Sequence, residues 1–277
     1  MESPAGAGQE GHIPVVADIF YLIDHRLIAA VMVVLLLLAC EIGYRLGLAK
    51  QGSPESLRTL MTGIGGAMLG LLGLLLGFAL TMAISRWDER RDIIIEEANA
   101  IGTLSLRASL LPEPLEGQLR EALRAYTQKR ITLGGARDRP DVLRMALDKS
   151  EDIHVVIWSI VERLNVPATN NAVLAALINS ANELIDLHEL RLASLQNQLP
   201  SALFYLLLSL AALSVAFLAW SFGAASHRGR APMILLALLI GAVLLLIMDV
   251  NRPQRGIIEV GVASLERAQK SISVPME

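Results

Sequence analysis

The residues with the most chemical potential in this 277-residue chain are carboxylates and amides beside long apolar segments. Glu97 and Asn99 follow one such segment, and Asp249, Asn251 and Arg252 follow another. Groups of this kind attract or repel ions, and they form ion pairs that fix or gate a membrane helix. No catalytic pattern accompanies them, because the chain has no His-Glu-x-x-His, Gly-x-Ser-x-Gly, cysteine pair or Walker loop. We therefore expect no enzyme activity, no cofactor and no metal site.

A row of glycines at spacings of three and four residues is the second feature with functional potential. It consists of Gly63, Gly66, Gly70, Gly73 and Gly77, which we call the glycine stripe. On a helix this spacing places bare backbone along one face. Either a second helix packs closely against that face, as small residues allow in lipid, or the face lines a pore with room for ions or water. A nucleotide-binding loop is disfavoured, because no strand precedes these glycines and they lie in an apolar helix.

Polar residues continue the same helical line beyond the glycine stripe. At 3.6 residues per turn, Thr81, Asp88, Asp92 and Asn99 fall close to it. If this face points at the axis of an oligomer, Thr81 lines the pore, and Asp88, Asp92, Glu97 and Asn99 form a polar mouth. Acidic rings at such a mouth favour cations. The competing interpretation is a solvated helix exit whose charges only offset one another.

Opposite charges are also expected to meet at one membrane face. Arg86 and Arg90 leave the second apolar segment where Asp249, Asn251 and Arg252 end the fourth. An ionised aspartate at the edge of hydrocarbon is costly without a partner. A structural ion pair is the first interpretation of this group, and a gate or ion site is the second.

Four apolar segments must position all of these residues. The chain is 53% hydrophobic with a mean hydropathy of +0.51, which is too apolar for an ordinary soluble domain. A spanning helix needs about 20 apolar residues, and backbone groups in lipid must be paired within the segment. We therefore predict an all-α membrane protein with four transmembrane helices. They cover Leu27–Tyr44, Gly63–Ile84, Ser201–Ala225 and Pro232–Met248.

The rest of the chain divides around these spans. Residues 85–199 have helical periodicity and predict an all-helical soluble domain inserted between the second and third spans. The region Gly63–Leu110 contains no proline, so one unbroken helix of 48 residues is expected to join membrane and domain. Residues 1–26 are expected to be an N-terminal interfacial segment, and 250–277 a C-terminal tail.

Charge indicates the partners and the orientation. The net charge is −3 and no basic block with aromatics appears, which argues against nucleic acid as a partner. Nine Lys and Arg lie near span ends on the domain side and five in the two short loops, although the nine are spread over more chain. The larger number of basic residues on the domain side predicts that the domain is cytoplasmic. The protein itself is expected to lie in a bacterial inner membrane. The expected partners are the lipid bilayer, further copies of the chain and ions.

Several motifs in combination resemble a four-span membrane family called bestrophin-like domain proteins, a domain of unknown function. They are the Leu-Leu-Gly-Phe-Ala-Leu end of the second span, Glu97–Thr103, Asn182–His188 with Arg191, and Asp249–Pro253. The resemblance covers roughly residues 20 to 265. It implies kinship with bestrophins, which are oligomeric anion channels with four spans, a cytosolic helical domain and a pore lined by the second span. The bestrophin neck is built around prolines and aromatics on that helix, whereas this chain has no proline between Ser56 and Leu111. Anion selectivity is therefore not implied.

These observations lead to one main hypothesis and two others. The main one is a homo-oligomeric ion channel, or channel-like protein, with the second span near the pore axis and an acidic mouth that favours cations. The alternative is a non-conducting scaffold or sensor, whose long helix couples the bilayer to a partner of the helical domain and whose glycine stripe is closely packed. A membrane enzyme is third. It requires a single pocket formed by Glu96, Glu97, Asn99, Asp249 and His188.

Overall fold

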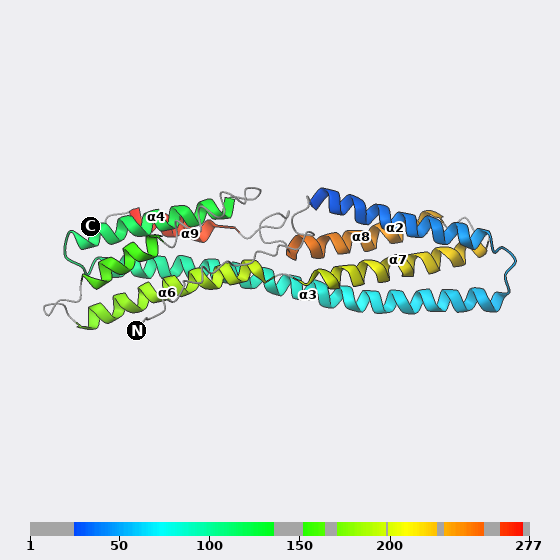
Figure 1. The fold of residues 1–277 in the computed structure, drawn as a ribbon, viewed down its shortest axis with the longest axis horizontal. Helices are drawn as coiled ribbons and strands as arrows, with labels where there is room; N and C mark the ends of the chain where they lie inside the picture. The colour runs from blue at the N-terminus through cyan, green and yellow to red at the C-terminus, as the bar shows by residue number, and fades with distance from the viewer. Residues whose placement is uncertain are drawn as a thin grey trace, which may run out of the picture.

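The computed structural model describes residues 25–135, 152–163, 171–197, 199–225, 230–251 and 261–273, and the regular elements within them are all helices (Figure 1). Besides seven labelled helices, the described residues include a helical stretch at 152–162. The labelled helices are α2 (His25–Leu48), α3 (Glu55–Ala108), α4 (Leu115–Gly135), α6 (Asn171–Gln196), α7 (Ser201–Ala224), α8 (Arg230–Asn251) and α9 (Ala263–Ser273). The prediction of an all-α fold is confirmed.

Four of these helices are long and apolar enough to cross a membrane, namely α2, α3, α7 and α8. They contain the four predicted spans, except that Ala225, the last residue of the predicted third span, is the C-cap of α7. A tight turn joins the first two, and Gly52 in that turn has a φ of +83°, a conformation that glycine adopts without steric cost. Pro54 and Pro200 directly precede α3 and α7, positions where the missing proline N–H costs no helical hydrogen bond.

Helix α3 extends through both halves of the molecule. It contains 54 residues without a break, which is about 80 Å at 1.5 Å per residue. Figure 1 shows it running from the end of the membrane bundle, beside α7 and α8, to the far end of the helical domain, beside α4, α6 and α9. The expected unbroken helix is thus present, but it begins at Glu55 rather than Gly63 and ends at Ala108 rather than Leu110.

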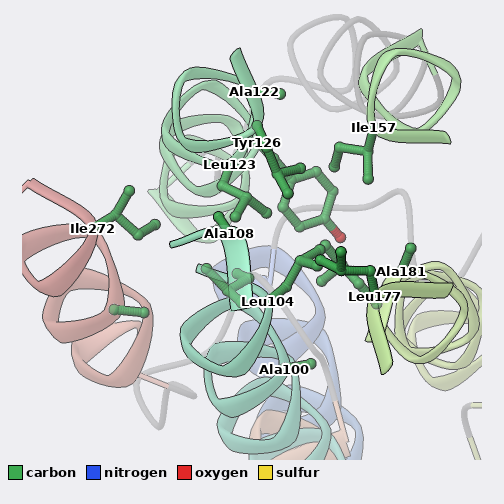
Figure 2. Close-up of a cluster of buried hydrophobic side chains, with 14 of the residues drawn as sticks. Ala100, Leu104, Ala108, Ala122, Leu123, Tyr126, Ile157, Leu177, Ala181 and Ile272 are labelled. Atoms are coloured by element: carbon green, nitrogen blue, oxygen red, sulfur yellow. The ribbon is translucent and has the colours of Figure 1, made fainter. Parts of the chain in front are cut away.

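Two separate apolar cores surround the two halves of α3. In the membrane bundle, α7 and α8 pack against the face of α3 that carries Leu72 and Ala83, and α2 packs on the other side of α7 and α8. In the domain, Leu104 of α3 meets Leu123 and Tyr126 of α4 and Leu177 of α6, as Figure 2 shows. The last described helix, α9, joins this domain core.

The C-terminal region therefore contributes more than the tail that the sequence suggested. Leu265 and Ile272 of α9 are fully buried in the domain core. The Ile272 carbonyl accepts a hydrogen bond of 3.1 Å from Arg124 Nη2 on α4. Helix α4 from the inserted region and helix α9 from the C-terminal region thus pack against each other and against α3.

Small residues bring two membrane helices into backbone contact, but these are not the residues of the glycine stripe. A Cβ atom added to Gly43 of α2 would lie 2.3 Å from the Ala216 carbonyl oxygen of α7, and one added to Gly47 would lie 2.1 Å from that of Trp220. Gly223 of α7 approaches the Tyr44 carbonyl in the same way, at 2.3 Å. The close packing that small residues permit in lipid is therefore found between α2 and α7.

Candidate functional site

The glycine stripe lies on the face of α3 that points away from its own bundle. The apolar residues Leu72, Leu76, Ala79 and Ala83 face inward and are buried. All five stripe glycines are exposed, and a Cβ added to any of them would meet no atom within 4 Å in the described part of the chain. Within one chain the stripe is an open surface rather than a helix-packing contact.

The polar continuation of the stripe lies on the same exposed face. Thr81, Asp88, Asp92 and Asn99 are all exposed. The Thr81 hydroxyl donates to the Gly77 carbonyl oxygen at 2.9 Å, within its own helix. One face of α3 therefore carries bare backbone in the membrane and carboxylates and an amide beyond it.

Of the two basic residues near this line, one is buried and the other is exposed beside an aromatic ring. Arg90 is buried and donates from Nη2 to the Val250 carbonyl oxygen at 2.9 Å. The guanidinium of Arg91 lies 6.0 Å from the centre of the Trp87 ring. Asp88 and Asp92 thus remain on the exposed line.

Glu97 does not belong to this exposed face, and the structure corrects its expected place in the polar mouth. Its side chain is fully buried in the domain. One carboxylate oxygen accepts from Arg130 Nε at 2.5 Å and from the Tyr126 hydroxyl at 2.7 Å, and the other accepts from Arg191 Nη1 at 2.5 Å. The reason is helical phase, because two residues turn a helix by about 200° and so separate Glu97 from Asn99.

The surroundings of Glu97 keep it ionised. Burial by itself raises the pKa of the carboxyl group, but Arg191, Arg130 and the Tyr126 hydroxyl outweigh that effect and hold the pKa below its usual value. A sequence signal for this burial existed, since Glu97 is in phase with the buried residues Ile94, Ile101 and Leu104.

An open groove of about 570 Å³ lies between α3 and α6 on the exposed side of Asn99. Its lining is acidic and amide-rich. The residues are Glu96, Asn99, Asn179, Asn182, Glu183, Asp186, Leu187 and Leu190. Sequence analysis named Glu96 and Asn99 as candidate site residues and Asn182–His188 only as a family motif, because α6 joins the groove through the tertiary fold.

The junction between membrane and domain is held by backbone contacts of polar side chains. Arg90 caps the carbonyl end of α8 at Val250, where a positive charge is favourable. Asn251 is fully buried, and its Oδ1 accepts from the Leu199 N–H at 3.0 Å, just before α7. The ion pair expected between Asp249 and Arg86 or Arg90 stays a prediction, and Arg252 lies outside the described residues.

The five residues that an enzyme pocket required are found in three places. Glu96 and Asn99 line the open groove, Glu97 and His188 are buried in the domain, and Asp249 lies at the end of α8. The arrangement therefore removes the specific pocket on which the enzyme hypothesis depended.

Comparison with protein families gives a match to the bestrophin-like domain over residues 27–265. The fold resembles a point mutant of a bacterial bestrophin homologue from Klebsiella pneumoniae, with a TM-score of 0.66 and 13% identity over 86% of this chain and 97% of that chain. A zinc-phased structure of a homologue from the same organism matches with a TM-score of 0.62 and 15% identity, covering 92% and 96% of the two chains. A comparison with curated proteins gives no match.

Proposed function

The chain belongs to the bestrophin-like domain family, and we propose that it forms a homo-oligomeric ion channel in which the exposed face of α3 surrounds the axis and cations are preferred. The observation that carries this proposal is the glycine stripe, which is open over its whole length within one chain. Copies arranged with this face inward would leave a path along bare backbone.

The other outward faces of the membrane bundle support this orientation. Lipid-facing positions of membrane helices are typically large and apolar. Val34 and Leu38 on α2, and Leu235 and Leu239 on α8, are exposed and fit that description. The stripe contains only glycine, and small residues are typical of positions where another element or an aqueous path must come close to the backbone.

The charges beyond the stripe support a preference for cations. In an oligomer, Asp88 and Asp92 would form two acidic rings about one helical turn apart. Arg90, which lies between them in sequence, is buried and donates to the Val250 carbonyl oxygen of α8, so its charge does not lie on the exposed line. We further propose that the domain lies in the cytoplasm beneath a bacterial inner membrane.

Ion flux through liposomes that contain the purified protein tests this proposal. We expect the protein to pass potassium, and we expect Gly70→Phe to cut the flux at least tenfold because the ring would occupy the path. Leu239→Phe is the matched control, since it enlarges an exposed side chain on a lipid-facing surface of α8. It should leave the flux unchanged.

Tight liposomes together with a monomer or dimer in detergent would overturn the channel. Equal flux through Gly70→Phe and the parent protein would overturn the placement of the α3 face at the pore axis. Tight liposomes would leave the non-conducting scaffold or sensor as the function. A flux that persists in Asp88→Asn with Asp92→Asn, but loses its preference for potassium over chloride, would assign selectivity to these two residues.

A further inference from the structure

The buried cluster around Glu97 joins four helical segments in the core of the domain. Glu97 comes from α3, Arg130 from α4 and Arg191 from α6, and all three side chains are at least nine-tenths buried. His154 of the 152–162 stretch and His188 of α6 are buried beside them. We call these five residues together with Tyr126 the Glu97 cluster.

The charges of the Glu97 cluster do not balance. Two guanidinium groups share one carboxylate, and the described residues bring no second carboxylate to act on Arg191 or on the two histidines. Burial, followed by Arg130, lowers the pKa of His188 to about 3 and that of His154 to about 4. Both imidazoles are therefore neutral near pH 7, and among the described residues no carboxylate offsets the remaining positive charge of the cluster.

Several hydrogen-bonding atoms of the Glu97 cluster are buried without a partner. They are Nη1 and Nη2 of Arg130, both ring nitrogens of His188, and Nε2 of His154. The two imidazole rings meet edge to face with centroids 4.7 Å apart, and the Tyr126 ring lies 5.2 Å from His154 and 5.6 Å from the Arg130 guanidinium carbon. The unpartnered polar atoms, which include the Arg130 donors and one N–H of the neutral His188 ring, thus belong to side chains that lie together in the core.

A buried cation with unused donors is unfavourable unless something supplies both charge and hydrogen-bond acceptors. Water can accept the hydrogen bonds, but it leaves the positive charge uncompensated. A small anion does both, because it accepts from the free edge of Arg130 and from an imidazole N–H.

We propose that the Glu97 cluster binds one small monovalent anion of the halide class between Arg130, His154 and His188. Glu97 and the anion would then offset the two guanidinium groups, and α3, α4, α6 and the 152–162 stretch would share one balanced polar core. The site is separate from the α3 face, so its existence does not depend on the proposed channel.

Diffraction from crystals of the full chain grown in bromide tests the site directly. We expect an anomalous bromine peak within hydrogen-bonding distance of Arg130 Nη1 or Nη2. An ordered water at that position without anomalous signal would overturn the proposal, and so would density that shows direct bonds from Arg130 to both histidines.

Thermal unfolding of the detergent-solubilised protein gives an independent test. Bromide that replaces gluconate at constant ionic strength should raise the melting temperature by roughly 3 °C and then saturate, as expected for a ligand that binds only the folded state. Arg130→Met removes the surplus charge and should abolish this rise. Arg120→Met, on the same helix but paired with Glu116 outside the cluster, should retain it.

Equal melting curves of the parent protein in the two salts would contradict the proposal. If Arg130→Met does not fold, His188→Glu takes its place, since it supplies a carboxylate beside Arg130. This variant should be insensitive to bromide, and a full bromide response in it would likewise contradict the site.

Discussion

The membrane bundle and the helical domain are built on the same helix, but they hold it in different ways. In the membrane, α3 presents an apolar face to its neighbours, and the closest packing is a backbone contact between α2 and α7 at Gly43 and Gly47. In the domain, an apolar core encloses a charged cluster at Glu97. Close helix packing in the membrane half thus depends on residues without side chains. Pairing of the buried charges in the domain half depends on one carboxylate.

The adjacent residues Glu96 and Glu97 show how strongly position on the helix decides a role. Glu96 lines the open groove, whereas Glu97 is fully buried between two arginines. Both are glutamates, and both lie beyond the same apolar span. A carboxylate here is a surface charge or a structural centre according to the face of α3 on which it lies.

Among the variants that test this difference between the two regions, we expect neutralisation of Glu97 to lower stability the most. Glu97→Gln removes the carboxylate that two buried guanidinium groups share, and removal of one member of a buried ion pair typically costs about 3–5 kcal/mol. We expect a loss of that size in the unfolding free energy of the domain, measured by denaturant titration. Glu96→Gln is the matched control and should change stability by less than about 0.5 kcal/mol. Equal effects of the two variants would refute the distinction between the neighbours.

We expect the second-largest loss of stability when a side chain is added at a glycine contact between α2 and α7. Gly47→Leu places a side chain where the α7 backbone lies, and such overpacking costs about 1–3 kcal/mol. We expect a lower yield of folded protein and a lower melting temperature in detergent. Gly66→Leu inserts the same side chain on the open stripe and should leave the melting temperature of the single chain unchanged. If Gly66→Leu is as damaging as Gly47→Leu, the stripe is a packing contact.

Acid should weaken the domain before the membrane bundle. The folded state holds His188 and His154 with pKa values lowered to about 3 and about 4, against 6.5 for a free imidazole. Between pH 6.5 and 4 the unfolded chain therefore binds more protons at these histidines than the folded domain does. The free energy of unfolding falls as the pH drops through this range. We expect hydrogen exchange in α4 and α6 to accelerate over this range. His188→Phe should flatten the dependence, and an unchanged profile in that variant would exclude His188 as its source.

The smallest effect is expected at the junction between the two regions. Arg90→Met removes the hydrogen bond to the Val250 carbonyl and should cost about 1–2 kcal/mol. Arg91→Met provides the control, because Arg91 is exposed and contacts only the Trp87 ring among the interactions described for it. A junction that mechanically couples membrane and domain should also respond in flux, with Arg90→Met changing the open fraction and Arg91→Met leaving it unaltered.

The four spans and the long helix could be predicted from sequence because their causes are local. Apolar length predicts a membrane helix, and the absence of proline from Gly63 to Leu110 allows one helix to continue. The exposed line from Gly63 to Asn99 could be drawn for the same reason, since helical phase is set by spacing alone. The family resemblance was also readable, because its motifs are short runs of chain.

Contacts between residues far apart in the sequence could not be predicted from local sequence patterns. The sequence alone determined that α3 is a helix with one glycine face, but it did not determine which face meets the rest of the chain. Only the tertiary structure brought Arg130 and Arg191 to Glu97, placed α9 in the domain core, and directed the closest helix packing to Gly43 and Gly47. The physical reason is that a single helix specifies its own phase, whereas burial depends on which surfaces of other segments exclude water from it.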